Sequence, residues 1–106
     1  MTPRPTSIRL NGVTWQIRAM TRVEFLTEER DNLIGQCKHD STTLQIASES
    51  PINRQRAVLW HEIVHAVEGD AGLSFTEEQI RSMASGLFSA LRNNPDVARW
   101  LLEEGD

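Results

Sequence analysis

One pentapeptide, His61-Glu62-Ile63-Val64-His65, constrains this chain more than any other feature. Residues four positions apart lie one above the other on a helix, so both imidazoles can reach the same cation. Neutral imidazole suits zinc, and a pair of imidazoles leaves room for a third protein ligand and a water. Glu62 lies about 100° round the helix from His61, from where its carboxylate can take the proton of a water on the metal. The pattern therefore predicts a zinc site that activates water.

The residues around the pentapeptide predict a long helix. It is expected to run from about residue 51 to residue 68, where two nearby glycines favour a helix end. Apolar side chains cover much of its circumference, and Trp60, Ile63 and Val67 form the centre of that face. The two histidines fall on the opposite side. A largely buried helix would thus present two histidines and a glutamate from its remaining face.

The third ligand is less strongly specified. His39, the only other histidine, lies upstream of the motif, which excludes a downstream histidine. Glu68 lies on the histidine side of the same helix, but about 4.5 Å further along its axis than His65. On the next helix, Glu77 lies about 60° from the middle of the apolar stripe, whereas Glu78 lies about 160° away. We favour Glu77 as the ligand; Glu68 and Glu78 stay open, as does a simple role for both first-turn glutamates at the helix dipole.

The first half of the chain predicts strands. Residues 8–18 alternate apolar and polar side chains on both sides of Asn11-Gly12, which is the strongest short signal for a β-hairpin. Residues 21–33 fit either a short helix or a loop. Residues 42–47 carry two apolar side chains in alternation and fit one further strand.

The second half predicts two more helices. A capping box at Thr76-Glu77-Glu78-Gln79 opens a helix to about residue 92, and Asn94-Pro95-Asp96 caps the last one. The chain is expected to form one α+β domain over residues 1–106, with residues 1–7 frayed. A small antiparallel sheet, made of the N-terminal hairpin and one strand, would pack against three helices. The tryptophans are expected to pack in the core: Trp15, Trp60 and Trp100.

Composition limits the class of function. The chain has 106 residues and a formal net charge of −4, which fits one small domain and gives little grip on nucleic-acid phosphates. Its single cysteine, Cys37, excludes an intrachain disulfide framework and agrees with a reducing compartment. No apolar run approaches a membrane span, and no signal-peptide pattern opens the chain. We therefore expect a cytoplasmic protein without nucleic-acid or membrane partners.

Other polar residues are weaker candidates for the site. Cys37 is expected to be a small half-buried residue rather than a nucleophile, and His39 a solvated loop residue. Asp40 or Asp70 could hydrogen-bond a ligand imidazole. A peptidase of this chemistry also needs a side chain that stabilises the oxyanion. Because the chain has no tyrosine, His39 or an arginine would have to serve, or the metal alone.

Residues 55–67, QRAVLWHEIVHAV, resemble the active-site helix of small phage-associated HExxH metallopeptidases, which are minimal relatives of the ImmA/IrrE family of zinc endopeptidases. Residues 73–95 are similar to the helix that follows it in those proteins. Together the likeness covers about half the chain. This chain departs from the larger family members because it has neither a helix-turn-helix nor a sensor domain, so cleavage of a transcriptional repressor is not carried over.

The resemblance implies a minimal zincin-like fold and a bound Zn²⁺ ion. It implies that a glutamate on the downstream helix, here Glu77, is the third zinc ligand. It also implies that the strand before the motif helix, residues 43–47, lines the cleft and that the substrate backbone pairs with this strand.

The sequence supports two candidate functions. The first is a zinc-dependent metallopeptidase, more an endopeptidase than an exopeptidase, acting on a peptide or protein substrate. His61, His65 and Glu77 would hold the metal, with Glu62 as general base. The alternative is a catalytically weak or inactive zincin-fold protein that binds a partner, has a regulatory role and uses zinc structurally. Loss of function in Glu62→Gln, with the metal retained, would distinguish the first from the second.

Overall fold

The computed structural model describes residues 2–27 and 34–105 and shows an α+β domain, as the sequence predicts. Its elements are β1 (Ser7–Leu10), β2 (Val13–Met20), α1 (Arg22–Thr27), β3 (Gly35–Lys38), β4 (Thr43–Ala47), α2 (Ile52–Asp70), α3 (Glu77–Asn93) and α4 (Pro95–Leu102). The short helix considered for residues 21–33 is α1, and the rest of that segment, residues 28–33, lies outside the described residues.

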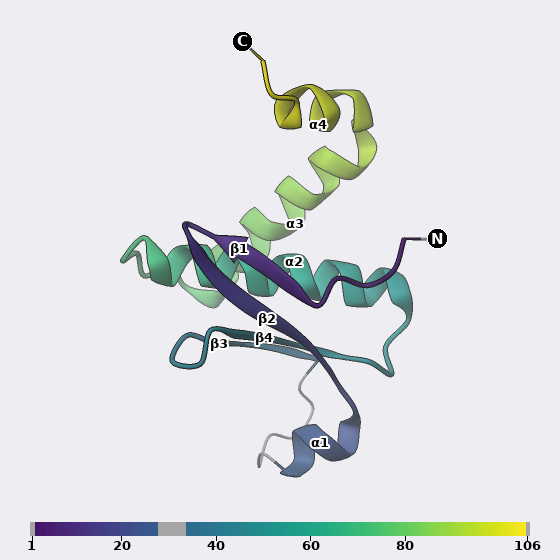
Figure 1. Cartoon of the computed structure of the whole chain (residues 1–106), viewed down its shortest axis with the longest axis vertical. Helices are drawn as coiled ribbons and strands as arrows, with labels where there is room; N and C mark the ends of the chain where they lie inside the picture. Colours follow the sequence, from purple (N-terminus) through teal and green to yellow (C-terminus); the bar gives the residue numbers. More distant parts are fainter. Residues whose placement is uncertain (1, 28–33, 106) are drawn as a thin grey trace.

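The strands form one four-stranded mixed sheet in the order β1-β2-β4-β3 (Figure 1). β1 and β3 each pair antiparallel with a neighbour, whereas the two central strands, β2 and β4, run parallel. The expectation of a purely antiparallel sheet of one hairpin and one strand is therefore wrong. β3 escapes prediction because it has only four residues and a single apolar side chain, Cys37, which is too little for a recognisable strand pattern. It forms a second hairpin with β4. Because the chain reverses between β3 and β4, β4 runs parallel to β2.

The predicted first hairpin is confirmed. Asn11 and Gly12 have φ angles of 48° and 80°, the two positive values that a tight type I′ turn requires. On the return strand Trp15 and Ile17 are buried, while Gln16 between them and Arg18 after them are exposed. The alternation thus places one face of β2 in the core.

The N-terminal residues, expected to be frayed up to residue 7, contact the domain. Ser7 is the first residue of β1, and the Thr6 carbonyl accepts a hydrogen bond of 2.9 Å from the Ile17 amide. Arg4 Nη1 donates to Gln55 Oε1 at 2.9 Å. The segment is held because it continues the edge strand of the sheet.

α2 covers the sheet, and α3 packs against α2 rather than forming a second layer on the strands (Figure 1). The expectation that all three helices lie on the sheet is therefore corrected. Four buried residues form the centre of the core between sheet and helix: Trp15, Ile17, Leu44 and Ala66.

The buried stripe of α2 differs from the predicted one. It contains Gln55, Val58, Glu62 and Ala66, spaced three to four residues apart, whereas Val67 is 44% exposed. Trp60 turns to α3, where its indole Nε1 donates to the Ala84 carbonyl at 2.9 Å. α2 is apolar on nearly all sides, so a helical wheel cannot tell which side meets the sheet and which meets α3.

The end of α3 and all of α4, residues 86–102, project away from the sheet, and we refer to this part as the C-terminal arm (Figure 1). Trp100, expected in the core, is 74% exposed. α4 has no buried residue. Several apolar side chains of the arm are also exposed: Leu87, Leu91, Val97, Leu101 and Leu102. Among the described residues, none of the helices has the length and apolar character needed to cross a membrane.

Candidate metal centre

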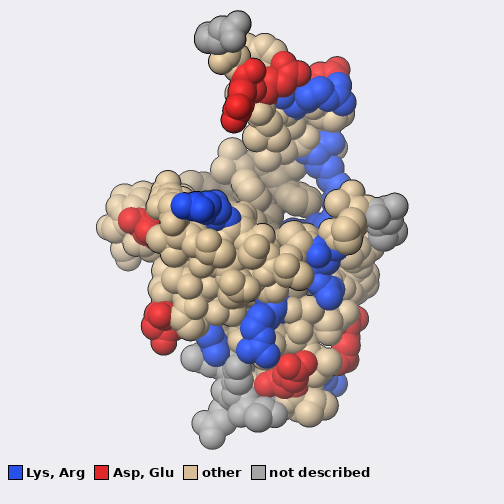
Figure 2. Space-filling view, viewed as in Figure 1, with Lys and Arg blue, Asp and Glu red and all other residues tan. Residues whose placement is uncertain are grey.

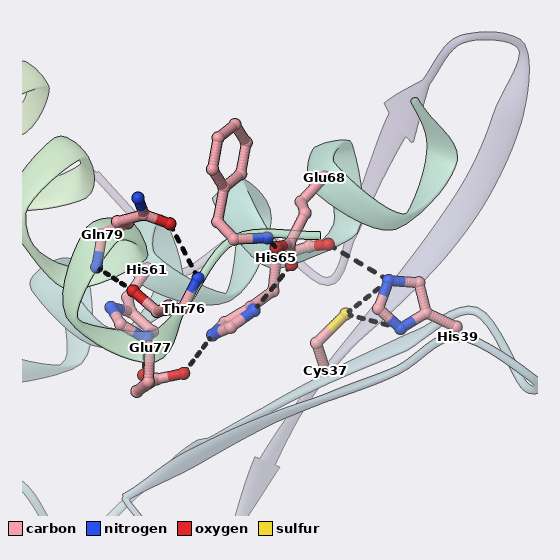
Figure 3. Close-up of polar contacts among 9 residues, drawn as sticks. Cys37, His39, His61, His65, Glu68, Thr76, Glu77 and Gln79 are labelled. Atoms are coloured by element: carbon pink, nitrogen blue, oxygen red, sulfur yellow. Dashed lines mark hydrogen bonds and ion pairs between the residues drawn. The ribbon is translucent and has the colours of Figure 1, made fainter. Parts of the chain in front are cut away.

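The motif histidines and Glu77 converge on one point between α2 and α3 (Figure 3). His61 Nε2 lies 2.8 Å from Glu77 Oε1, and His65 Nε2 lies 3.1 Å from Glu77 Oε2. One ligand-type atom from each residue lies within 4.8 Å of the others. Both histidines are half-buried, whereas the Glu77 side chain is 55% exposed. The structure thus brings together the three residues that the sequence selects as metal ligands.

The start of α3 sets the position of Glu77. Thr76 Oγ1 accepts from the Gln79 amide at 3.1 Å, and Gln79 Oε1 accepts from the Thr76 amide at 2.9 Å. This is the predicted capping box, which makes Glu77 the first helical residue. With the first turn fixed in this way, Glu77 faces α2, while Glu78 is exposed and takes no part in the cluster.

A second carboxylate, Glu68, lies on the other side of the His65 ring. Its Oε1 lies 3.4 Å from His65 Nδ1, and its Oε2 accepts a hydrogen bond of 2.6 Å from the Phe75 amide (Figure 3). The Phe75 bond lowers the pKa of Glu68 below its usual value, which keeps the carboxylate charged. A charged carboxylate at Nδ1 favours the proton on that nitrogen and leaves Nε2 free to bind a metal. Glu68 is therefore placed to support a ligand rather than to be one.

Neither aspartate proposed for this supporting role contacts a motif histidine through a described hydrogen bond. Asp40 Oδ1 accepts from the Ser41 amide at 2.9 Å, and Asp70 Oδ2 accepts from Asn11 Nδ2 at 2.6 Å. Glu68 has the role instead, because residues three apart on a helix lie side by side. That spacing is visible in the sequence.

Glu62 lies on the sheet side of α2 and is only 7% exposed. Burial raises the pKa of its carboxyl group to about 7; the His65 charge lowers this pKa and the Glu77 charge raises it. A carboxylate with a pKa near neutrality is suited to take up and release protons. A divalent cation at the neighbouring cluster would lower the pKa of Glu62.

Gly35, at the start of β3, makes room for Glu62. A Cβ atom at this position would overlap Val58 Cγ1 and would lie 3.0 Å from Glu62 Oε2. The absence of a side chain therefore lets the strand backbone approach the buried carboxylate closely.

β3, and not β4, borders the cluster. β4 is hydrogen-bonded on both edges, to β2 and to β3, so it has no edge free for another strand. The expectation that residues 43–47 line the cleft and receive the substrate is therefore wrong. A cavity of about 260 Å³ lies between β3 and the helices, lined by Gly35, Gln36, Cys37, His39, His61, Glu62, His65 and Glu77.

His39 is held by the domain although its side chain is exposed. Its Nε2 lies 3.1 Å from the His65 carbonyl oxygen, and its ring meets Trp15 edge to face at a centroid distance of 5.7 Å. Gly69 lies directly against the ring, because a Cβ atom there would overlap the imidazole. These contacts favour a structural role, and they leave His39 poorly placed to stabilise an oxyanion.

Cys37 is half-buried, as expected, and its Sγ lies 3.8 Å from both ring nitrogens of His39. Burial, together with the charges of Glu62 and Glu68, raises the pKa of its thiol to about 12. The thiol therefore stays protonated at neutral pH, which makes Cys37 a poor nucleophile.

A larger cavity of about 660 Å³ extends from the cluster along α2 and α3. It shares four lining residues with the smaller cavity, so the cluster lies where the two meet: Gly35, His61, Glu62 and Glu77. Arginines also line it: Arg54 from α2, and Arg81 and Arg92 from α3.

The residues at the cluster fit zinc. Two imidazole nitrogens and one carboxylate oxygen form a donor set found in catalytic zinc sites, which leave a fourth position open. Ligand atoms around a tetrahedral zinc lie about 3.4 Å apart. One such atom from each of the three residues lies within 4.8 Å of the others, so small side-chain rotations would bring them to this spacing.

No protein family, curated protein or solved structure matches this chain. The geometry of the cluster therefore carries the inference of function. The sequence does not single out Gly35, Arg54 or Arg81 as residues of the site. Arg81 follows Glu77 by four residues and Arg54 precedes His61 by seven, both helical repeats that place residues on one face.

Proposed function

We propose that this protein is a zinc-dependent metallopeptidase. The observation that carries the proposal is the convergence of His61, His65 and Glu77 on one point beside the buried carboxylate of Glu62. When bound there, zinc supplies the Lewis acidity that polarises a peptide carbonyl and activates water. The resemblance of residues 55–67 and 73–95 to small phage-associated metallopeptidases agrees with this function, and the single cysteine agrees with a cytoplasmic location.

In this mechanism Glu62 accepts a proton from water and later donates it. Its carboxylate acts first as general base towards water and then as proton donor to the leaving amine. Burial raises the pKa of Glu62 to about 7 in the metal-free protein, and the charge of a bound cation would lower it again, so that the carboxylate would be ionised and able to accept a proton at neutral pH. Glu68 orients His65, and the capping box of α3 orients Glu77.

The edge strand β3 receives the substrate backbone as an added strand. The two cavities extend from the cluster in different directions, one along β3 and the other along α2 and α3. A polypeptide can therefore continue past the reacting bond on both sides. This arrangement favours an endopeptidase over an exopeptidase.

Arg81 is the candidate for oxyanion stabilisation. It lies one turn after Glu77 on α3 and lines the same cavity as Glu62. A guanidinium group there can donate hydrogen bonds to the oxygen on which negative charge develops. Because the chain has no tyrosine, no phenol group can stabilise the oxyanion, and Arg81 does so instead.

The second candidate function is a partner-binding protein with structural zinc. The exposed apolar side chains of the C-terminal arm favour it, because such surfaces are used in protein contacts. In this case the metal would stabilise the junction of α2 and α3, and Glu62 would carry no chemistry.

Metal content tests the site. Wild type, Glu77→Ala and the matched control Glu78→Ala are purified and dialysed against a mild chelator before zinc is measured. We expect about one zinc per chain in wild type and Glu78→Ala, and loss of zinc in Glu77→Ala. A wild-type protein that retains no zinc and shows no thermal shift on adding it would overturn the proposal.

Activity tests the role of Glu62. Zinc-loaded wild type and Glu62→Gln are incubated with a mixed peptide library, and new termini are identified by mass spectrometry. We expect cleavage by wild type and at least about a hundredfold slower cleavage by Glu62→Gln, with zinc content unchanged. Zinc-loaded wild type that cuts nothing would favour the partner-binding function.

A further inference from the structure

The larger cavity has arginines at its rim that take no part in the proposed metal binding or proton transfer. Val58 and Ala84 are buried beneath it and Phe88 is half-buried, so the floor is apolar. Arg54 and Arg92 are exposed at its rim. An apolar floor with cations at the edge is suited to a ligand that combines hydrocarbon with a negative charge.

The three arginines that line this cavity have no acidic partner among the residues that the structure describes. In the part of the chain that the structure describes, no ion pair joins Arg54, Arg81 or Arg92 to a carboxylate, although the chain has a net charge of −4. Arg92 is held by neutral groups: its Nη2 donates to Asn53 Oδ1 at 3.0 Å, and its guanidinium lies 5.3 Å from the centre of the Phe88 ring. These contacts position the cation without neutralising it. Figure 2 shows basic side chains beside the hollow between the C-terminal arm and the body.

The metal cluster and the rim arginines lie in different parts of the larger cavity. α2 and α3 run in opposite directions, so Arg92, near the end of α3, lies beside Asn53, near the start of α2. Arg54 precedes His61 by seven residues, about 10 Å along the helix axis. An extended peptide covers that distance in about three residues. The metal cluster thus lies at one end of the groove and the Arg54–Arg92 pair towards the other.

We propose that this groove selects polypeptide segments with an acidic side chain about three residues from the bond to be cut, flanked by apolar residues. Arg54 and Arg92 pair with the carboxylate, and the apolar neighbours lie on Val58 and Phe88. The position relative to the cut bond rests on the proposed peptidase function. Recognition of the acidic segment does not require turnover.

The test uses zinc-loaded Glu62→Gln, which binds without cutting, and fluorescein-labelled twelve-residue peptides of Ala, Leu and Ser. Each peptide carries one Glu, moved along the sequence, and is matched by a peptide with Gln at that position. Fluorescence anisotropy should show that Glu at one favoured position binds about three- to tenfold more tightly than Gln. This preference should shrink as salt rises.

Charge reversal identifies the residues responsible. Arg54→Glu and Arg92→Glu, each in the Glu62→Gln background, should abolish the preference for Glu over Gln. Arg9→Glu, an exposed arginine of β1 outside the groove, should leave it unchanged. Circular dichroism checks the fold, and Arg54→Gln replaces any reversed variant that does not fold.

The outcomes separate this inference from the peptidase function. Equal binding of Glu and Gln peptides at every position would overturn acid selection even if wild type cuts both. Selective binding of Glu peptides without any cleavage by wild type would keep the groove assignment and overturn the peptidase. Tighter binding of a ten-residue oligothymidylate, lost in Arg54→Glu, would assign the groove to nucleic acid and overturn acidic-peptide selection.

Discussion

The candidate metal centre and the C-terminal arm differ in how their side chains are partnered. At the centre, both Nε2 atoms of the histidines, both oxygens of Glu77 and both oxygens of Glu68 have a described polar contact. In the arm, Trp100 is 74% exposed and α4 buries nothing. The sheet, α2 and the first turn of α3 therefore form the candidate site, whereas α4 contributes exposed surface.

The largest expected contrast is in metal affinity. His65→Ala should weaken zinc binding by about 300- to 8,000-fold, because it removes about a third of a binding free energy on the order of 10–16 kcal/mol. Trp100→Ser, in the arm, should leave the zinc dissociation constant unchanged. Competition with a chromogenic chelator measures both. If the two variants lost zinc equally, the separation of site and arm would be wrong.

Thiol reactivity should differ almost as much between the two regions. At pH 8, a thiol with a pKa of about 12 has about a thousandfold less thiolate than one with the ordinary value of 9.0. Metal-free native protein should therefore react slowly with iodoacetamide at Cys37. Its rate should rise about tenfold per pH unit from pH 8 to pH 11.

The control is Cys37→Ser with Val97→Cys, which moves the thiol to the exposed arm. Its rate should be high at pH 8 and level off above about pH 9. Glu62→Gln should accelerate the reaction of Cys37, because the Glu62 charge helps to raise the pKa of that thiol. Equal rates at residues 37 and 97 would contradict the prediction.

Stability of the metal-free protein should fall with pH because of Glu62. Its folded pKa, about 7, lies above the ordinary value of 4.5, so ionisation in the folded state is unfavourable. The stabilisation of the protonated form is complete below pH 4.5, declines between pH 4.5 and 7, and is lost above pH 7. The total is about 3 kcal/mol. Urea titrations in EDTA at a series of pH values give the free energy of unfolding. It should fall more steeply with pH for wild type than for Glu62→Gln, and parallel curves would refute the prediction.

The smallest contrast is between two glycines. Gly35→Ala should destabilise the protein by about 1–3 kcal/mol, because the new Cβ overlaps Val58 and crowds Glu62. Gly86, on α3, has no neighbouring atom within 4 Å of an added Cβ, so Gly86→Ala should stabilise it by up to about 1 kcal/mol. Thermal melts measure both. A stabilising effect of Gly35→Ala would show that the packing at residue 35 is looser than described.

Much of the site follows from the sequence because helical spacing is a local property. The interval between His61 and His65 places both imidazoles on one side of α2, and the capping box fixes the turn that carries Glu77. The helical wheel of residues 77–93 also distinguishes Glu77 from Glu78 correctly, since of these two glutamates only Glu77 reaches the histidines.

What the sequence leaves open depends on contacts between distant segments. β3 has no pattern of its own and exists because it pairs with β4. The buried face of α2 is chosen by its two neighbours, the sheet and α3, and apolar residues on nearly all sides hide that choice. Trp100 looks like a core residue on α4, but no other part of the described chain reaches far enough to cover it.

The position of Glu77 at the first residue of α3 has a consequence for the whole helix. An ion held by α2 and by this residue would pin the two helices together at one end, next to a short connection. Arg81 and Arg92 belong to α3, so the same pin would set the width of the groove that they line. Removal of a bound metal would then loosen the groove at that end, so a chelator would weaken the binding of a peptide in the groove even where no bond is cut.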